Sequence, residues 1–297
     1  MAEGEDLLTE SALSVVREYS DLENVEEYTL ICAVRAVHDF SISNCTIQTM
    51  ADAPGAKKAW IPLESNPEVF TELLHNLGVS ESLAFTDVLS LDDRDLLSLV
   101  PRPVLGLVFV FPGQEISPAY QKARAEQEAG REVYQGSGPE EDVLWFKQTI
   151  GNACGLHALL HVVTNGPARE YIKHDSILSH FLDTAVPLTP KSRALVLEDS
   201  VELEAAHTAA AHKGDSVVPP DPNVEAQFGY IAFVKSQKNG HLYQMAGYYK
   251  GPIDMGPMGE DEDLLSKSAL DAVREFIDRE KGKTVNFSLL ALVPVQD

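Results

Sequence analysis

The chain has 297 residues, 44% of them hydrophobic, which is enough for a large core in one domain or in one domain with an appendage. The 46 acidic residues outnumber the 23 basic ones and give a net charge of −23. That charge disfavours nucleic acid and anionic membrane as partners; it favours a neutral or basic protein partner, although solubility alone would also account for it.

The cysteines and the apolar runs indicate the compartment. The three cysteines, Cys32, Cys45 and Cys154, are few and widely spaced, so we expect neither a disulfide framework nor a zinc or other metal site. No basic-then-apolar leader opens the chain, and no apolar run approaches the ~20 residues of a membrane span. A cytoplasmic location is expected, with the nucleus as the alternative.

The N-terminal part differs in composition from the rest of the chain. Up to Pro54 it holds eleven acidic residues and two basic ones, Arg17 and Arg35. We therefore predict an acidic N-terminal extension over 1–57 and a compact domain over 58–297. Two interpretations of the extension stay open: it is a helical appendage, or the mature protein begins at Met50.

The remaining elements are predicted from periodicity, caps and turns. Asn66-Pro67-Glu68 is a typical helix start, and a continuous apolar run over 104–111 between two prolines is typical of a buried strand. Helices are further expected over 119–132, 175–185, 191–212 and 264–280, a hairpin over 230–245 with its turn at Lys238-Asn239-Gly240, and a last strand over 284–293. This mixture predicts an α+β fold.

The segment Gln148-Thr149-Ile150-Gly151-Asn152-Ala153-Cys154-Gly155 carries the strongest chemical signal. Asn152 is expected to cap a helix over 152–164, which would place Cys154 in the first turn. There the helix dipole and the free N–H groups favour a thiolate. Gln148 offers a side-chain N–H to an oxyanion formed when that sulfur attacks a carbonyl. The arrangement is typical of a cysteine hydrolase.

Several segments in order resemble the ubiquitin carboxyl-terminal hydrolases, a papain-like family of cysteine peptidases. They are Trp60-Ile61-Pro62-Leu63-Glu64-Ser65-Asn66-Pro67, the segment 147–155, Leu203-Glu204-Ala205-Ala206-His207, Gly240-His241-Leu242-Tyr243 and Gly251-Pro252-Ile253. The resemblance implies a central, mostly antiparallel sheet flanked by helices, with a knotted backbone. It also implies a monomeric deubiquitinating thiol protease without a cofactor, acting in ubiquitin-dependent protein processing. The C-terminal tail of ubiquitin or of a ubiquitin-like protein would thread beneath a crossover loop over about 204–222.

The resemblance fails at two positions of the implied catalytic triad. The family's histidine corresponds to Gly229, and its aspartate corresponds to Ala246, while the glycine after that aspartate is retained as Gly247. A cysteine peptidase needs a base for its thiol and an orienting group for that base. In subtilisin, losing the triad histidine lowers turnover by about 10⁶. We therefore expect severely impaired hydrolysis.

The remaining histidines differ in how well they could replace the missing base. His207 and His212 flank the predicted crossover loop and are the candidates for a substitute base. His241 belongs to the hairpin turn, and His157 and His161 have the spacing of core residues on the helix of Cys154. Two hypotheses follow: a pseudoenzyme that binds the C-terminus of ubiquitin, or an active deubiquitinating hydrolase that uses Cys154 with a non-standard base.

Overall fold

The computed structural model describes residues 58–112, 118–215, 228–280, 282 and 286–296, all within one compact unit, Ile31–Asp297. The predicted extension over 1–57 lies outside the described residues. None of the helices in the described part of the chain combines the length and apolar character needed to cross a membrane.

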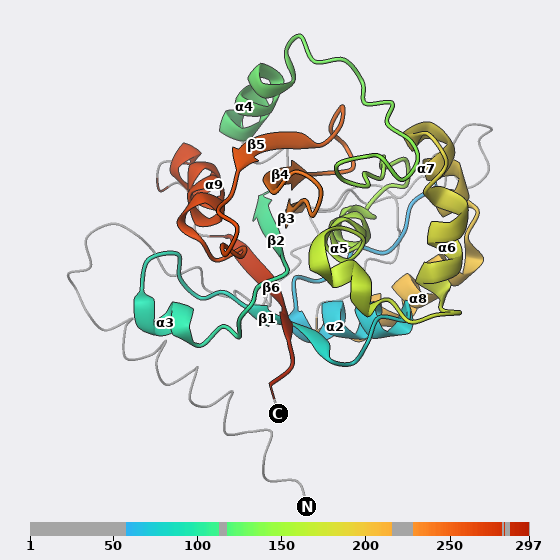
Figure 1. The fold of residues 1–297 in the computed structure, drawn as a ribbon, viewed down its shortest axis with the longest axis horizontal. Helices are drawn as coiled ribbons and strands as arrows, with labels where there is room; N and C mark the ends of the chain where they lie inside the picture. Colours follow the sequence, from blue (N-terminus) through green and yellow to red (C-terminus); the bar gives the residue numbers. More distant parts are fainter. Residues whose placement is uncertain (1–57, 113–117, 216–227, 281, 283–285, 297) are drawn as a thin grey trace, which may run out of the picture. The chain divides into compact units, whose positions relative to one another are not determined.

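A six-stranded sheet runs through the middle of the unit (Figure 1). The strands are β1 (Leu83–Asp87), β2 (Gly106–Pro112), β3 (Phe228–Lys235), β4 (His241–Met245), β5 (Ile253–Pro257) and β6 (Ser288–Pro294). They are ordered β1-β6-β2-β3-β4-β5, and every neighbouring pair is antiparallel. The α+β prediction is confirmed, whereas the knotted backbone stays a prediction.

Helices cover both faces of the sheet. They are α2 (Pro67–Asn76), α3 (Arg94–Ser98), α4 (Pro118–Glu128), α5 (Cys154–Val163), the 3₁₀ helix η1 (Gly166–Tyr171), α6 (Ile177–Ala185), α7 (Pro190–Glu198), α8 (Val201–Ala211) and α9 (Lys267–Arg279). Helices α2, α5, α6 and α8 contribute to the larger hydrophobic core on one face of the sheet. Helix α9, with Tyr120 from α4, builds the second core on the other face.

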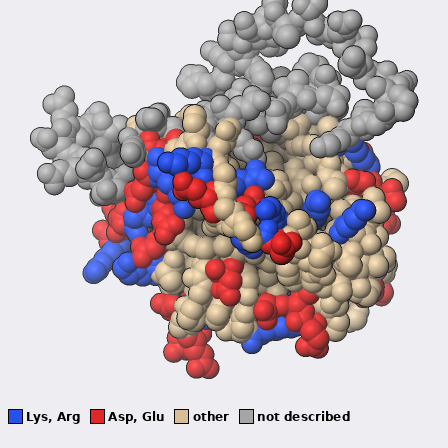
Figure 2. Space-filling view, turned by 90° about the horizontal axis from the view of Figure 1, so that it is seen from above, with Lys and Arg blue, Asp and Glu red and all other residues tan. Residues whose placement is uncertain are grey.

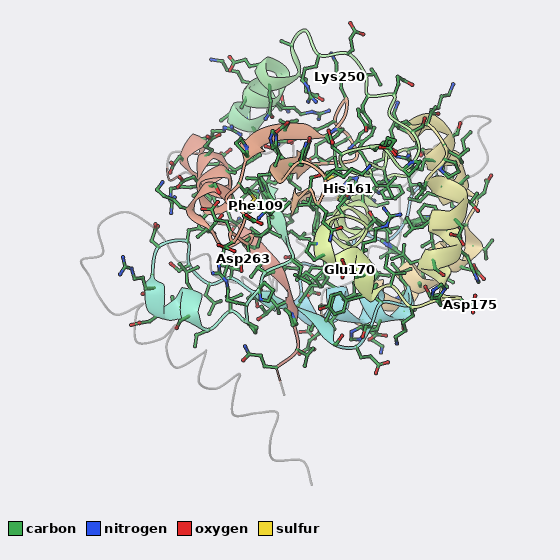
Figure 3. All side chains as sticks on the ribbon, in the orientation of Figure 1. Phe109, His161, Glu170, Asp175, Lys250 and Asp263 are labelled. Atoms are coloured by element: carbon green, nitrogen blue, oxygen red, sulfur yellow. The ribbon has the colours of Figure 1, made fainter. Side chains whose placement is uncertain are left out.

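Strand β3 shows how the two-residue period of a strand divides these cores. Tyr230 and Ala232 point to the face that packs against α5, whereas Ile231 and Phe233 point to the α9 face. Figure 3 shows the same division: Phe109 of β2 lies toward α9, and His161 lies on α5. The sheet is therefore buried on both sides.

The capping signal at Asn66 predicted the start of α2 correctly. Asn66 accepts a hydrogen bond from the Glu68 N–H at 2.9 Å and caps α2, with Pro67 at the first helical position. The helix expected over 191–212 is instead two helices, because the Ser200 hydroxyl accepts from Leu203 N and starts α8 anew.

The predicted crossover loop over 204–222 is wrong in its first half. Helix α8 continues to Ala211, and its cap residue is His212. Val201 to Ala211 has no proline or glycine to end the helix early, and buried alanines and Leu203 hold it against the core. The second half of the expected loop, from residue 216 on, lies outside the described residues.

Candidate functional site

Cys154 is the first residue of α5. The cap of this helix lies one position later in the chain than the sequence suggested. Asn152 is not the N-cap; it has φ +58°, and Ala153 is the cap residue, with no capping side-chain hydrogen bond. Asparagine tolerates this left-handed conformation better than most residues, so the same residue type serves a tight turn instead of a cap. The expected place of Cys154 in the first turn is nevertheless observed.

The helix that carries Cys154 packs tightly against its neighbours. Residues 155–163 are all buried, and α5 packs across β3 and β2. Two glycines permit this approach: a Cβ on Gly155 would lie 3.1 Å from Leu63 Cβ, and one on Gly106 would lie 2.2 Å from Val162 Cγ1. The position of the sulfur is therefore fixed by close packing.

The thiol of Cys154 is not set up as a thiolate. Its sulfur lies 3.9 Å from the carbonyl oxygen of Phe228 at the start of β3, and the residue is partly exposed. Burial raises the pKa of the Cys154 thiol to about 11, and the backbone N–H groups of Cys154 and Gly155 offset only part of this. The expectation of a favoured thiolate is therefore wrong: desolvation outweighs the helix start.

Gln148 lies beside the site, but its amide is turned inward. Its Nε2 donates to the carbonyl oxygen of Ile150 at 2.9 Å, closing a turn within its own loop. Its Oε1 is buried without a hydrogen-bond partner among the described residues. A role as oxyanion donor stays a prediction; the bond to Ile150 uses one of the two N–H groups of the amide.

The space beside Gly229 is filled by a phenylalanine ring. Gly229 of β3 pairs with Phe111 of β2, and a Cβ on Gly229 would lie 2.7 Å from Phe111 Cζ. Phe111 is 3% exposed, and its ring centroid lies 4.5 Å from that of Tyr120. A larger side chain at residue 229 therefore requires this buried ring to move.

Ala246 and Gly247 follow β4, at the same end of the sheet as Gly229. Ala246 is buried at 2% exposure in the α9 core, so nothing polar projects from this position. The Gly247 carbonyl accepts from Gln148 N at 2.8 Å, and a Cβ on Gly247 would lie 2.7 Å from Gln148 Cβ and 2.9 Å from His157 Cδ2. Gly247 is thus needed for the close contact between this turn and the loop of Gln148.

Neither candidate substitute base makes a hydrogen bond with Cys154. His207 is fully buried in α8, where its Nε2 bonds the Ile61 carbonyl at 2.7 Å and its ring packs 4.9 Å from Trp60. Burial lowers the pKa of His207 to about 4, so the ring is neutral and serves packing. His212 is exposed at the end of α8.

The other histidines are engaged elsewhere. His161 accepts from Phe146 N at 3.0 Å, and His157 bonds the Ala153 carbonyl at 2.8 Å; both are buried on α5. His241 pairs with Asp254 at 2.9 Å between β4 and β5. Among the described residues, Cys154 thus has a carbonyl as its side-chain hydrogen-bond partner and no imidazole.

Sequence reasoning missed a tyrosine cluster next to this site. Tyr248 and Tyr249 directly follow Gly247, and their hydroxyls meet that of Tyr120 from α4. The available signal was the Tyr248-Tyr249 pair directly after Gly247 in the sequence. The partner from α4 could not be inferred, because the contact spans more than 120 residues.

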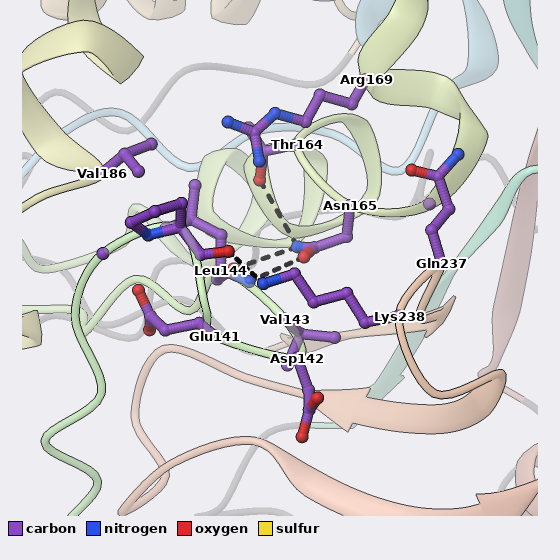
Figure 4. Close-up of a pocket in the computed structure, with 13 residues that line it drawn as sticks. Glu141, Asp142, Val143, Leu144, Thr164, Asn165, Arg169, Val186, Gln237 and Lys238 are labelled. Atoms are coloured by element: carbon purple, nitrogen blue, oxygen red, sulfur yellow. Dashed lines mark hydrogen bonds between the residues drawn. The ribbon is translucent and has the colours of Figure 1, made fainter.

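A small pocket lies at the other end of α5, about 15 Å from Cys154 along the helix axis. It is lined by residues 138–144, the end of α5, η1 and the turn between β3 and β4 (Figure 4). Asn165 bonds both the N–H and the carbonyl of Leu144, and Lys238 donates to the Pro139 carbonyl. These polar groups hold the fold together, so we assign no binding role to the pocket.

The matches to known proteins extend over most of the chain, including the segments described above. The model of the ubiquitin carboxyl-terminal hydrolases, family 1, matches residues 60–278. A ubiquitin carboxyl-terminal hydrolase of Drosophila melanogaster is 37% identical over 237 residues, which cover 80% of this chain and 98% of the fly protein. The isozyme L1 of Homo sapiens is 36% identical over 231 residues, covering 78% and 96% of the two chains.

Solved structures agree on the fold. The catalytic domain of Trichinella spiralis UCH37, bound to ubiquitin vinyl methyl ester, matches with a TM-score of 0.61 and 24% identity, covering 81% of this chain and 98% of that chain. A second structure of the same protein, covering 80% of this chain and 83% of that chain, gives a TM-score of 0.57. At this identity the likeness shows the shared architecture.

Proposed function

Since the chain belongs to the ubiquitin carboxyl-terminal hydrolase family, we propose that it binds the C-terminal tail of ubiquitin or a ubiquitin-like protein but hydrolyses it only very slowly. The observation that carries this proposal is the environment of Cys154. Its thiol has a pKa of about 11 and faces a backbone carbonyl, with no base bonded to it among the described residues. At pH 7 the thiol is therefore protonated.

Gly229 and Ala246 support the same proposal. By the family resemblance they occupy the places of the triad histidine and aspartate, and neither carries a titratable side chain. The ring of Phe111 occupies the space that an imidazole at residue 229 would need. A leaving group would therefore receive no proton from a triad histidine.

Binding is supported by the family and by charge. The related UCH37 structures hold a ubiquitin derivative, and a net charge of −23 suits the basic tail of ubiquitin. On the face drawn in Figure 2, acidic side chains lie beside basic ones around a broad area that carries neither charge. We therefore expect the long-range field of the whole chain, and not one acidic patch on this face, to attract the tail.

Calorimetry with free ubiquitin tests the binding proposal. We expect saturable binding in the micromolar range, and weaker binding of a ubiquitin that lacks its last two glycines. The Cys154→Ala variant should bind as the wild type does, because binding needs no nucleophile. If ubiquitin at several hundred micromolar gave no heat of binding, the proposal would be refuted.

The retained Gln148 and Cys154 favour a second candidate, an active thiol hydrolase with a non-standard base. A protein that only binds needs neither a nucleophile nor an oxyanion donor. This candidate predicts robust turnover that vanishes in Cys154→Ala. The raised pKa of the Cys154 thiol weighs against it, as does the carbonyl, in place of a base, at its sulfur.

A further inference from the structure

The ring of His157 lies one turn after Cys154 on α5 and bonds the carbonyl group that precedes the cysteine. Its Nδ1 lies 2.8 Å from the Ala153 oxygen, which also accepts the backbone N–H of His157 at 3.0 Å. A carbonyl can only accept, so Nδ1 carries the hydrogen of the ring and donates it. The residue is 1% exposed, and burial lowers its pKa to about 4, so the ring is neutral at pH 7.

The bonded carbonyl shares its peptide group with the N–H of Cys154. The atoms of a peptide group lie in one plane, so a bond that fixes the Ala153 oxygen also fixes the direction of the Cys154 N–H. The N–H of a first helical residue such as Cys154 has no carbonyl partner within its own helix. The N–H groups of Cys154 and Gly155 lower the pKa of the thiol, against the larger effect of burial. The direction of the Cys154 N–H therefore bears on how readily the sulfur ionises.

The opposite edge of the ring packs against the turn after β4. A Cβ on Gly247 would lie 2.9 Å from His157 Cδ2 and 2.7 Å from Gln148 Cβ. The Gly247 carbonyl in turn accepts from Gln148 N at 2.8 Å. The ring thus lies between the start of α5 and the turn that holds the loop of Gln148. These contacts on its two edges keep the Nδ1–H directed at Ala153.

The helix does not need this second donor in order to begin. The backbone N–H of His157 already closes the first helical turn on the Ala153 oxygen. The side-chain bond adds to that turn in two ways. It restricts the orientation of the peptide group, and it polarises the group, which makes the Cys154 N–H a stronger donor.

We propose that His157 is a positioning residue for Cys154: its Nδ1–H holds the peptide group between Ala153 and Cys154 so that the Cys154 N–H donates to the thiolate when one forms. The buried thiol ionises to a small extent, and His157 sets that extent together with the N–H groups of the first turn. That the thiolate would meet the tail of a ubiquitin-like protein rests on the proposed function. The positioning itself does not depend on that function.

Two variants of the same shape isolate this bond. A threonine hydroxyl in a helix can donate to the carbonyl four residues earlier, as Thr164 does to the Leu160 carbonyl at 2.6 Å. His157→Thr therefore keeps a donor for Ala153, whereas His157→Val has nearly the same shape without one. Alkylation by iodoacetamide needs the thiolate, so its rate at Cys154 measures the fraction ionised. Mass spectrometry of the Cys154 peptide gives this rate between pH 7.5 and 9.5.

We expect His157→Val to react about threefold more slowly than His157→Thr at every pH in this range, as the loss of one hydrogen bond implies. The range lies below the thiol pKa of about 11, so the two pH profiles should be parallel. Thr164→Val is the control. It removes a bond of the same kind at the other end of α5 and should react as the wild type does.

A rate for His157→Val that equals or exceeds that of His157→Thr overturns the proposal, because the ring would then act by packing alone. An equal slowing in Thr164→Val also overturns it, since the effect would be general to the helix. If a variant at residue 157 does not fold, His157→Ser and His157→Ala make the same comparison. Calorimetry with ubiquitin answers the separate question: the expected rates without affinity for ubiquitin would uphold the role of His157 and refute the proposed function.

Discussion

At the level of single residues, the sequence located Cys154 at a helix start but did not reveal the surroundings of its thiol. Cys154 lies at a helix start as expected, yet burial raises its thiol pKa to about 11. Burial depends on contacts with distant segments, such as Leu63 and Phe228, that no local pattern reveals. The family resemblance implied that Gly229 and Ala246 correspond to triad positions. It could not reveal that the ring of Phe111 fills the space beside Gly229.

Placing a histidine and an aspartate where the family resemblance locates the triad tests whether the rest of the proposed site is competent. Gly229→His with Ala246→Asp should gain little turnover on ubiquitin conjugates, because the new Cβ meets Phe111 at 2.7 Å. Overpacking of this kind lowers the free energy of unfolding by about 1–3 kcal/mol. Adding Phe111→Ala should make room and raise turnover well above that of the double variant.

The control for this gain is Cys154→Ala in the triple variant, which should abolish it. Turnover in the double variant as high as in the triple variant would show that Phe111 does not block residue 229. Urea titrations of the wild type, the double variant and the triple variant measure the accompanying change in the free energy of unfolding.

At the level of elements, strong local signals were predicted well and weak ones were missed. The capped helix α2, the apolar strand β2 and the hairpin of β3 and β4 lie where turn chemistry and periodicity placed them. Strands β1 and β5 were missed, because each has five residues and only part of each strand is buried. Such short edge strands are specified by their neighbours in the sheet more than by their own residues.

One buried ion pair ties α7 to the segment before α5. Arg193 is fully buried; it donates to Glu141, to the Trp145 carbonyl at 2.9 Å and to the Ala185 carbonyl at 3.0 Å. We expect Arg193→Met to lower the free energy of unfolding by about 3–5 kcal/mol, since it leaves the Glu141 charge unpaired. Arg193→Lys should not restore it, because lysine lacks the planar fork.

Urea unfolding measures this loss, with Lys191→Met as the control. Lys191 is exposed on the same helix, and its replacement should change the free energy of unfolding by about 0.5 kcal/mol or less. A loss below about 1 kcal/mol in Arg193→Met would show that the pair does not hold α7 in place.

At the level of the whole molecule, three buried histidines make the fold sensitive to acid. Burial lowers the pKa of His157 and of His207 to about 4, and that of His161 well below its usual value. An unfolded histidine has a pKa near 6.5, so the unfolded chain takes up protons first as the pH falls. This contribution to stability is complete above about pH 6.5 and is lost between about pH 6.5 and 4.

Denaturant unfolding between pH 7.5 and pH 4 measures this effect. We expect a loss of up to about 3 kcal/mol from each of His157 and His207 over that range. His207→Leu should be less stable than the wild type at pH 7.5 but should lose less on acidification. His212→Leu, which removes an exposed imidazole at the end of the same helix, serves as the control. Equal losses in His207→Leu and the wild type would contradict this origin of the acid sensitivity.

The most direct test of the central claim is the release of a fluorescent group from the C-terminus of ubiquitin, measured for the wild type and for Cys154→Ala at pH 7.5. We predict rates for the two proteins that cannot be told apart, because the thiol is protonated and lacks a base. Robust turnover in the wild type that disappears in Cys154→Ala would contradict the claim and establish an active hydrolase with a base of another kind.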